Sequence, residues 1–147
     1  MRALIQRVSQ ASVAVREKNI RRSIGPGFVI LLGVSKTDTQ DSAKTLAQKA
    51  AYLRIFPNDE GKFDRSLLDV GGECLVISQF TLYGDASKGR RPDFTQAARP
   101  ETALPLYRLF IDELKAAGVK RVEEGEFQAH MEVSLTNDGP VTVTVET

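Results

Sequence analysis

Apolar and polar positions alternate along the first part of the chain with the period of strands. Residues 2–8 (Arg-Ala-Leu-Ile-Gln-Arg-Val) and 11–16 alternate in this way, which is typical of half-buried strands. Residues 20–24 form a weaker example of the same pattern, before a Gly-Pro-Gly turn. Residues 28–34 are continuously apolar, which indicates a strand covered on both faces. The first part of the chain therefore predicts four strands.

Two stretches change to the three- and four-residue spacing of amphipathic helices. The first covers about residues 39–53, with Asp38 or Thr39 able to cap its start. The second covers about residues 101–117 and is stopped by Gly118. The apolar faces comprise Ala43, Leu46, Ala47, Ala50 and Leu53 in the first helix, and Leu104, Tyr107, Phe110 or Ile111, and Leu114 in the second.

Shorter apolar or alternating runs complete the pattern, and all of them predict strands. They are residues 54–56, the run that follows Gly71-Gly72 and ends at 78, residues 121–123, 131–135 and 141–145. The order is strands, helix, strands, helix, strands. We therefore expect a single α/β domain over residues 1–147, with mixed β-sheets and the two helices packed on one face in β/β/α layers.

Polar side chains interrupt the end of the apolar run before residue 83. Ser78, Gln79 and Thr81 alternate there with Phe80 and Leu82. Burying hydroxyl and amide groups costs free energy unless each has a hydrogen-bond partner. The stretch is either a strand that becomes polar as it leaves the core, or a wall that presents polar groups to a ligand.

A second unusual stretch is Asn-Asp-Gly-Pro-Val-Thr at residues 137–142. Asn-Asp-Gly is typical of hairpin turns, and a proline can start an edge strand. The Gly139–Pro140 bond is also a place where a cis peptide is accessible, because the trans preference before proline is small. Carbonyl groups turned by such a bond could accept hydrogen bonds from an ammonium group.

The longest stretch without periodicity covers residues 83–99, and it is rich in basic residues. Long ordered loops in small domains are often functional. Basic groups contact phosphates and aromatic rings stack on bases, so the loop is compatible with RNA as well as with a solvated surface. Its basic and aromatic residues are Tyr83, Lys88, Arg90, Arg91, Phe94 and Arg99.

Composition excludes several kinds of site. The net charge is +1, so an RNA contact must come from a local patch. One cysteine, Cys74, excludes an internal disulfide, and one histidine, His130, argues against a zinc site or a histidine-based triad. We expect no metal and no cofactor. No window has the length of a membrane span and no signal peptide is evident, so we expect a cytoplasmic protein.

The two polar stretches together resemble the signature motifs of the D-aminoacyl-tRNA deacylase family. These motifs are Ser-Gln-Phe-Thr-Leu at 78–82 and Asn-Asp-Gly-Pro-Val-Thr at 137–142. The resemblance covers essentially the whole chain. It also includes residues 3–8, the strand end at 32–34, residues 54–56, the loop from Lys88-Gly89 to Phe94, and residues 131–135.

The resemblance implies a homodimer with active sites at the subunit interface. A cis Gly139–Pro140 bond of one chain would reach the pocket of the other, capture the α-amino group of the substrate and exclude L side chains. Arg7, which by itself is best interpreted as a surface charge, matches the position that holds the Gly-Pro carbonyls. Met131 matches the family. Gln128 and His130 depart from it, since a small residue and often an acid stand there.

The implied substrate is a D-amino acid esterified to the 3′-terminal adenosine of a tRNA. Backbone N–H groups near Phe80 and Thr81 could stabilise the oxyanion, with Gln79 orienting the ester. A threonine nucleophile needs an adjacent base, and neither motif contains His, Cys or Lys. We therefore expect Thr81 to position the substrate, with the ribose 2′-hydroxyl assisting as the resemblance implies. Catalytic candidates are Ser78, Gln79, Phe80 and Thr81.

Three alternatives remain open from the sequence. The first is a non-catalytic module that binds RNA ends through the basic loop, with Lys88, Arg90 and Arg91 as contacts. The second is an editing deacylase for glycyl-tRNA or another mischarged aminoacyl-tRNA. Glycine has no side chain, so a pocket that excludes L side chains cannot reject it. The third is a structural protein that dimerises through a hairpin.

Overall fold

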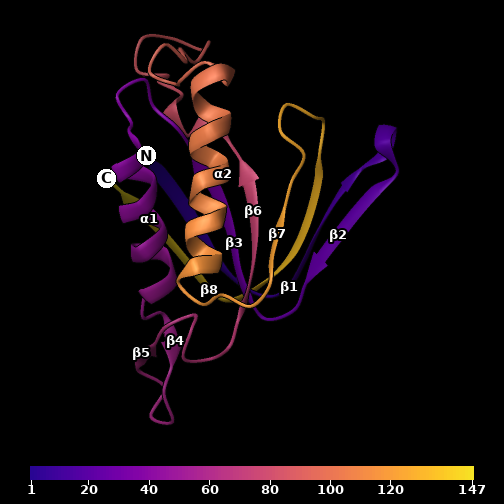
Figure 1. Cartoon of the computed structure of the whole chain (residues 1–147), viewed down its shortest axis with the longest axis vertical. Helices are drawn as coiled ribbons and strands as arrows, with labels where there is room; N and C mark the ends of the chain where they lie inside the picture. Colours follow the sequence, from indigo (N-terminus) through magenta and orange to yellow (C-terminus); the bar gives the residue numbers. More distant parts are fainter.

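A long first strand, β1 (Arg2–Val15), organises the sheet of the computed structural model, which describes all 147 residues (Figure 1). The first half of β1 pairs with β3 (Gly27–Gly33) and the second half with β2 (Ile20–Ile24). The last strand, β8 (Glu132–Glu146), runs antiparallel along the other edge of β1. β1 therefore joins the two ends of the chain and both halves of the sheet.

The prediction of two separate strands, over 2–8 and 11–16, is wrong. The residues between them, Ser9 and Gln10, remain in one continuous strand. Pairing with β8 holds them there, because Gln10 lies opposite Thr136 across an irregularity in the ladder. A shared partner strand thus overrides the polar interruption in the sequence.

The other strands extend this sheet or lie apart from it. β6 (Glu73–Ser78) runs parallel to β3, and β7 (Val122–Glu124) runs parallel to β6. The sheet order is β2-β1-β3-β6-β7, with β8 on β1. A separate two-stranded sheet contains β4 (Phe56–Pro57) and β5 (Phe63–Arg65), and a 3-10 turn, η1 (Arg16–Lys18), joins β1 to β2. The sheet is mixed, as predicted.

Helix α1 (Gln40–Tyr52) begins where the sequence indicates. Thr39 is the N-cap residue, and its hydroxyl accepts a hydrogen bond from the N–H of Ser42. The N–H of Thr39 in turn donates to the hydroxyl of Ser42. Asp38, the alternative cap, instead accepts from the N-terminal ammonium group of Met1. The predicted apolar face of α1 is buried, apart from half-buried Leu53 at its end.

Helix α2 (Pro100–Ala116) begins with Pro100 at its first position and ends before Gly118, which has a φ of +110°. Of its predicted face, Leu104 is only half-buried, and Leu106 is buried instead. Phe110 and Ile111, between which the pattern did not decide, are both buried. Neither helix has the length and apolar character that crossing a bilayer requires.

The core has two layers on the two faces of β3 and β6. Phe28 and Ile30 face the larger cluster, which includes the buried faces of α1 and α2. Val29 alternates with them and faces a smaller cluster with Leu75 of β6 and Ile24 of β2. The far half of β1 and β2 thus covers the second face, while both helices cover the first (Figure 1). The predicted β/β/α layering is confirmed.

The last strand differs from its prediction. The sequence favours strands at 131–135 and 141–145 joined by a turn, but the chain does not reverse there, and both parts lie in β8 against β1. Pairing with β1 stops at Asn137 and resumes at Thr142. Four residues, the 138–141 segment, therefore stand opposite a single residue of β1, Arg7, and bulge out of the ladder.

Candidate functional site

A cavity of about 750 Å³ lies beside the carboxyl end of β6. Its walls come from the end of β6, the start of α2 and the chain just before β8. Thirteen of its 19 lining residues are apolar, and the polar ones include Ser78, Gln79 and Arg99. A volume of this size and a mostly apolar lining with a few polar groups are typical of small-molecule sites. We refer to it as the main cavity.

The first motif enters the main cavity where β6 ends. Gln79 continues the pairing by donating its N–H to the carbonyl of Leu32 at 2.8 Å, and the chain then turns into a 3-10 helix, η2 (Phe80–Tyr83). Gly33 permits this turn to pack on β3. A Cβ at Gly33 would lie 3.1 Å from the Tyr83 ring and 3.2 Å from the Gln79 carbonyl oxygen.

Only part of the 78–82 motif lines the main cavity. Ser78, Gln79 and Phe80 line the main cavity, whereas Thr81 does not and is exposed. The Thr81 hydroxyl accepts a hydrogen bond from Nε2 of Gln79. The N–H groups of Phe80 and Thr81 begin η2, where they have no intrahelical partner, and neither donates to another backbone carbonyl outside η2. Both N–H groups are thus free to bind an oxygen atom.

No general base is positioned along the chain beside Thr81. The nearest acid in sequence is Asp85, whose carboxylate accepts from the N–H of Ser87 at 2.8 Å. This hydrogen bond holds the pKa of Asp85 below its usual range and makes the carboxylate a weaker base. Asp85 is therefore a poor candidate for the adjacent base that a threonine nucleophile needs.

The opposite wall of the main cavity comes from residues that the motifs did not indicate. Phe127 lies with its ring centroid 6.0 Å from that of Tyr107. Tyr107 is buried, and its hydroxyl donates to the carbonyl of Val76 at 2.9 Å. Only the helical pattern marked Tyr107, as a core residue, and Phe127 had no signal. Met131, which the resemblance did indicate, also lines the main cavity.

The two residues that do not match the resemblance lie at the same wall. Gln128 and His130 both line the main cavity and are exposed. Gln128 has a φ of +63°, a left-handed conformation that side chains other than glycine adopt at a cost. Gln128 thus lines the cavity in an unusual backbone conformation.

The second motif lies elsewhere on the chain. The Gly139–Pro140 bond is cis, as the resemblance implies, and both residues are exposed within the 138–141 segment. Gly139 has a φ of +127°, and a Cβ there would lie 2.8 Å from Cγ2 of Val141. Neither Gly139 nor Pro140 lines the main cavity of its own chain.

The Arg7 side chain, which comes from β1, binds the 138–141 segment. Its Nη1 donates to the Ile55 carbonyl at 2.5 Å and its Nε to the Asp138 carbonyl at 3.1 Å. The same Nε lies 3.0 Å from Oδ2 of Asp138. Arg7 is only 6% exposed, so the interpretation as a surface charge is wrong. The carbonyl it binds precedes Gly139 rather than belonging to the Gly-Pro pair.

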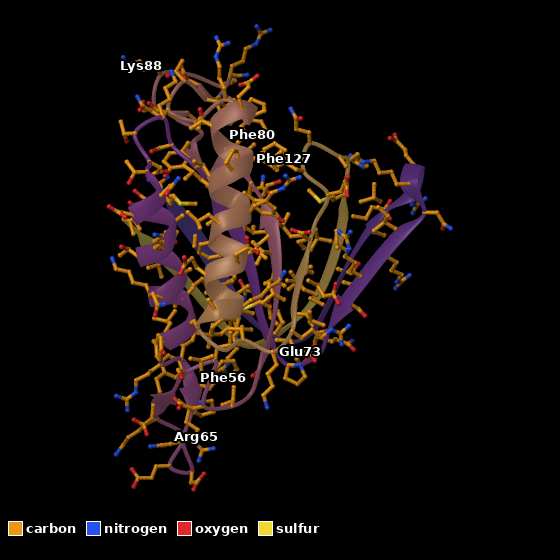
Figure 2. The ribbon with its side chains drawn as sticks, viewed as in Figure 1. Phe56, Arg65, Glu73, Phe80, Lys88 and Phe127 are labelled. Atoms are coloured by element: carbon orange, nitrogen blue, oxygen red, sulfur yellow. The ribbon has the colours of Figure 1, made fainter.

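The two motifs are well separated within one chain. Figure 2 places Phe56, whose ring lies beneath the guanidinium of Arg7, near the end of the molecule opposite to Phe80. Lys88 lies at the same end as Phe80. The structure thus brings Ser78, Gln79, Phe80 and Met131 together, and holds Arg7 with Gly139 in a second place.

The basic loop adjoins the main cavity. Lys88, Arg90 and Arg91 are exposed, and none of them forms an ion pair within the chain. The rings of Phe80 and Phe94 meet edge to face, with centroids 5.1 Å apart, and join the loop to η2. The later part of the loop, including Phe94 and Arg99, lines the main cavity, so these exposed cations belong to a segment that continues into the cavity wall.

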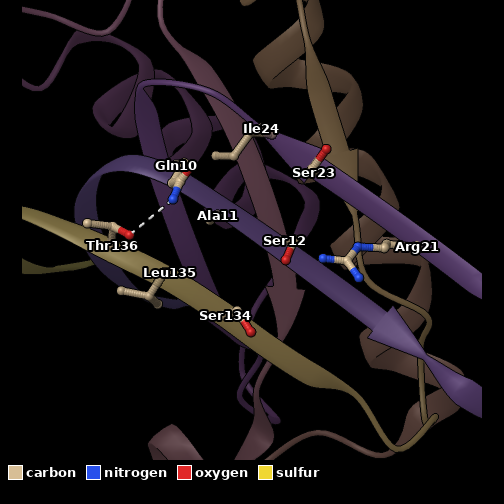
Figure 3. A pocket seen from close by; sticks show the side chains of 9 residues that line it. All are labelled: Gln10, Ala11, Ser12, Arg21, Ser23, Ile24, Ser134, Leu135 and Thr136. Atoms are coloured by element: carbon tan, nitrogen blue, oxygen red, sulfur yellow. Dashed lines mark hydrogen bonds between the residues drawn. The ribbon is translucent and has the colours of Figure 1, made fainter.

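A second hollow, of about 420 Å³, lies between β1, β2 and β8 (Figure 3). Serine and threonine side chains line it, and Gln10 donates to the Thr136 hydroxyl at 3.4 Å. Arg21 is its only charged side chain, and no acid or histidine lines it. It offers no group for acid–base chemistry, so the main cavity is the better candidate site.

Fold and cavity together describe a small α/β protein with a candidate ligand site at the end of parallel strands. Comparison with known families makes this specific. The model of the D-Tyr-tRNA(Tyr) deacylase family matches residues 4–146, and the chain belongs to that family.

Full-length relatives and solved structures agree with this assignment. A protein from Symbiobacterium thermophilum named D-aminoacyl-tRNA deacylase is 54% identical, covering 99% of this chain and 95% of the relative. One of the same name from Thermus aquaticus is 55% identical, with the same coverage. A solved structure titled c-Myc DNA Unwinding Element Binding Protein is similar, with a TM-score of 0.92 and 38% identity over 100% of this chain and 99% of its own. Another, titled a probable eukaryotic D-amino acid tRNA deacylase, shares the fold at 18% identity and a TM-score of 0.85, covering 99% and 98%.

Proposed function

We propose that the chain hydrolyses the ester bond of D-aminoacyl-tRNA and releases free D-amino acid and tRNA. The observation that carries the proposal is family membership over residues 4–146 combined with a main cavity that the first family motif lines. The relatives named D-aminoacyl-tRNA deacylase align over nearly their whole length, so the comparison covers every part of the site.

The main cavity takes the 3′-terminal adenosine and its aminoacyl group in this proposal. The free N–H groups of Phe80 and Thr81 stabilise the developing oxyanion, and Gln79 orients the ester. Ser78 and Met131 complete the wall. The ester is already activated, so positioning and charge stabilisation suffice, with the 2′-hydroxyl of the terminal ribose assisting. Lys88, Arg90 and Arg91 contact phosphates of the tRNA.

Chiral selection is assigned to the 138–141 segment of a second copy of the chain. Two features support this assignment: the segment is exposed, and its own chain's cavity lies elsewhere. In the proposed homodimer, the carbonyl groups of Gly139 and Pro140 bind the α-amino group and leave no room for an L side chain. Specificity then rests on steric rejection. Translation quality control of this kind places the protein in the cytoplasm.

The test is hydrolysis of matched D-tyrosyl-, L-tyrosyl- and glycyl-tRNA by the intact protein. We expect cleavage of the D ester to exceed that of the L ester by roughly 100-fold or more, because a misplaced side chain clashes with backbone. The glycyl ester should be cleaved too, since it has no side chain to reject. Equal cleavage of D and L esters would defeat the chiral assignment.

The same assay separates the alternatives. Binding of tRNA without cleavage of any ester would identify a non-catalytic module, and the relative titled as a DNA-binding protein makes this outcome worth measuring. Cleavage of only another mischarged aminoacyl-tRNA would identify an editing deacylase of different specificity. Failure to bind any tRNA would favour a structural protein.

Replacing Thr81 by alanine is expected to leave most of the activity, within about fivefold of the unmodified protein. The reason is that Thr81 has no adjacent base and its role is to position Gln79. Thr37→Ala is a matched control, because Thr37 is also an exposed threonine bonded to a side chain two residues away, Ser35. Mass spectrometry of quenched reactions tests the opposite case. An aminoacyl ester trapped on Thr81 would establish this residue as a nucleophile.

A further inference from the structure

Two aromatic rings lie against the buried guanidinium of Arg7. Its central carbon lies 5.9 Å from the ring centroid of Phe56 and 5.8 Å from that of Phe63. Cations within about 6 Å of an aromatic face are attracted to it, and the attraction strengthens when the cation is desolvated. Arg7 is 6% exposed, so both rings act on a largely desolvated cation.

The two rings have different relations to the core. Phe56 is buried and stacks on Phe28, with centroids 5.1 Å apart and ring planes 17° apart, so core packing accounts for it. Phe63 is 58% exposed on the small β4–β5 sheet. Core packing does not explain why an aromatic ring stands there, whereas contact with Arg7 does.

The guanidinium that these rings hold determines where the 138–141 segment lies. Its Nε donates to the Asp138 carbonyl, immediately before Gly139. Its Nη2 would lie 3.2 Å from a Cβ at Gly139, so the guanidinium is in close contact with the segment on that side as well. The half-exposed Asp138 carboxylate also lies 3.0 Å from the same Nε, so Nε binds both the carbonyl and the carboxylate of Asp138.

We propose that Phe63 is a positioning residue for chiral selection, acting through Arg7 on the 138–141 segment. The proposal rests on the proposed function of that segment. The Phe63 ring keeps water and alternative orientations away from the guanidinium, so that Nε stays on the Asp138 carbonyl. Without the ring, the guanidinium turns toward solvent, its hydrogen bond to the Asp138 carbonyl weakens, and the carbonyl groups of Gly139 and Pro140 lose their fixed direction. L side chains are then rejected less well.

The experiment compares Phe63→Ala, Phe63→Leu and Phe63→Tyr with the unmodified protein. We expect the ratio of kcat/KM for D- over L-tyrosyl-tRNA to fall about tenfold in Phe63→Ala and Phe63→Leu, and to stay within about twofold in Phe63→Tyr, which keeps the aromatic face. Tyr52→Ala is the matched control, because Tyr52 is 57% exposed and its ring forms no cation–π contact with Arg7. It should leave the ratio unchanged.

Hydrogen–deuterium exchange supplies a readout that does not depend on activity. Amide exchange in residues 136–143 should quicken in Phe63→Ala and not in Tyr52→Ala, while exchange in α1 and α2 stays the same. Unchanged exchange in residues 136–143 would overturn the inference, whether or not the protein hydrolyses any ester. Failure to hydrolyse any ester would instead count against the proposed function alone.

Two further outcomes overturn the inference. The first is Phe63→Leu behaving as the unmodified protein, because apolar bulk rather than the aromatic face would then suffice. The second is loss of discrimination together with dissociation of the assembly in sedimentation velocity, because Phe63 would then hold subunits together rather than position Arg7.

Discussion

Replacing Arg7 by methionine is expected to lower the free energy of unfolding by about 3 kcal/mol and to remove most of the preference for D esters. Methionine is about as long as the aliphatic part of arginine and keeps apolar contact with the aromatic rings. It has no donor, so the carbonyls of Ile55 and Asp138 lose their partners. Ile55 is buried, and a buried unpaired carbonyl costs about 1–3 kcal/mol.

The effect on discrimination follows from the position of the lost bond. With Nε gone, nothing fixes the carbonyl before Gly139, and the 138–141 segment is no longer held against β1. Urea unfolding measures the stability change, and the D- and L-tyrosyl-tRNA pair measures the loss of selectivity. The control is Arg54→Met. Arg54 also donates to a carbonyl, that of Asp64, and pairs with its carboxylate, but its side chain is 64% exposed.

Because exposed ion pairs contribute little, Arg54→Met should change the free energy of unfolding by no more than about 1 kcal/mol. Equal losses in Arg7→Met and Arg54→Met would show that burial of Arg7 is not what makes it important. A stable Arg7→Met protein with full selectivity would contradict the role of Arg7 in fixing the segment.

Replacing Gly27 by alanine is expected to cost about 3 kcal/mol or more and to leave little folded protein. Gly27 begins β3 and lies opposite Glu73 in the parallel pairing of β3 with β6. A Cβ at this position would lie 1.9 Å from the Glu73 carbonyl oxygen and 2.6 Å from its nitrogen. Backbone atoms cannot turn aside as a side chain can, so the two central strands must separate.

The matched control is Gly25→Ala, two residues earlier. A Cβ at Gly25 would meet nothing nearer than Oε2 of Glu73 at 3.9 Å, which is ordinary contact. Its φ lies outside the left-handed region, so we expect a change within about 0.5 kcal/mol. Thermal unfolding followed by circular dichroism compares the two variants. If Gly27→Ala had the same melting temperature as Gly25→Ala, β3 and β6 would be able to accommodate the methyl group.

Local patterns predicted the helices well because each boundary has a chemical cause in neighbouring residues. Thr39 caps α1 with the partner three residues later, and Gly118 ends α2 with a positive φ. The alternating and continuous apolar runs likewise located β2, β3 and β6. In these elements, the residues that determine the secondary structure lie within or next to the element itself.

The last strand shows where local patterns fail. Asn-Asp-Gly-Pro fits a hairpin as well as it fits a segment extruded from a continuous strand. The length of β1 decides between them, because β1 offers a pairing edge on both sides of Arg7. Arg7 itself reads as a surface charge until Ile55 and Asp138, 48 and 131 residues away, are brought to it. Only the family resemblance implies a structural role for Arg7, and it points to the Gly-Pro carbonyls where the structure shows the Asp138 carbonyl.

Local patterns indicated only some of the residues that line the main cavity. Ser78, Gln79, Phe80 and Met131 were indicated and do line the main cavity. Thr81 does not line it and is exposed, at the second residue of η2. Tyr107 and Phe127 reach the cavity only through the docking of α2 and of the chain before β8, which no local motif records.

The pairing of the first strand with the last has a consequence for folding. Contacts between β1 and β8 close most of the chain into one loop, and the entropy of that closure opposes folding until other contacts compensate for it. Folds with such high contact order assemble slowly, and pairings distant in sequence are the costly ones to form. The helices and the β3–β6 pair depend on nearer partners. The 138–141 segment depends on Arg7 and on the pairing of β1 with β8 on both sides of it, so we expect it to form late in folding.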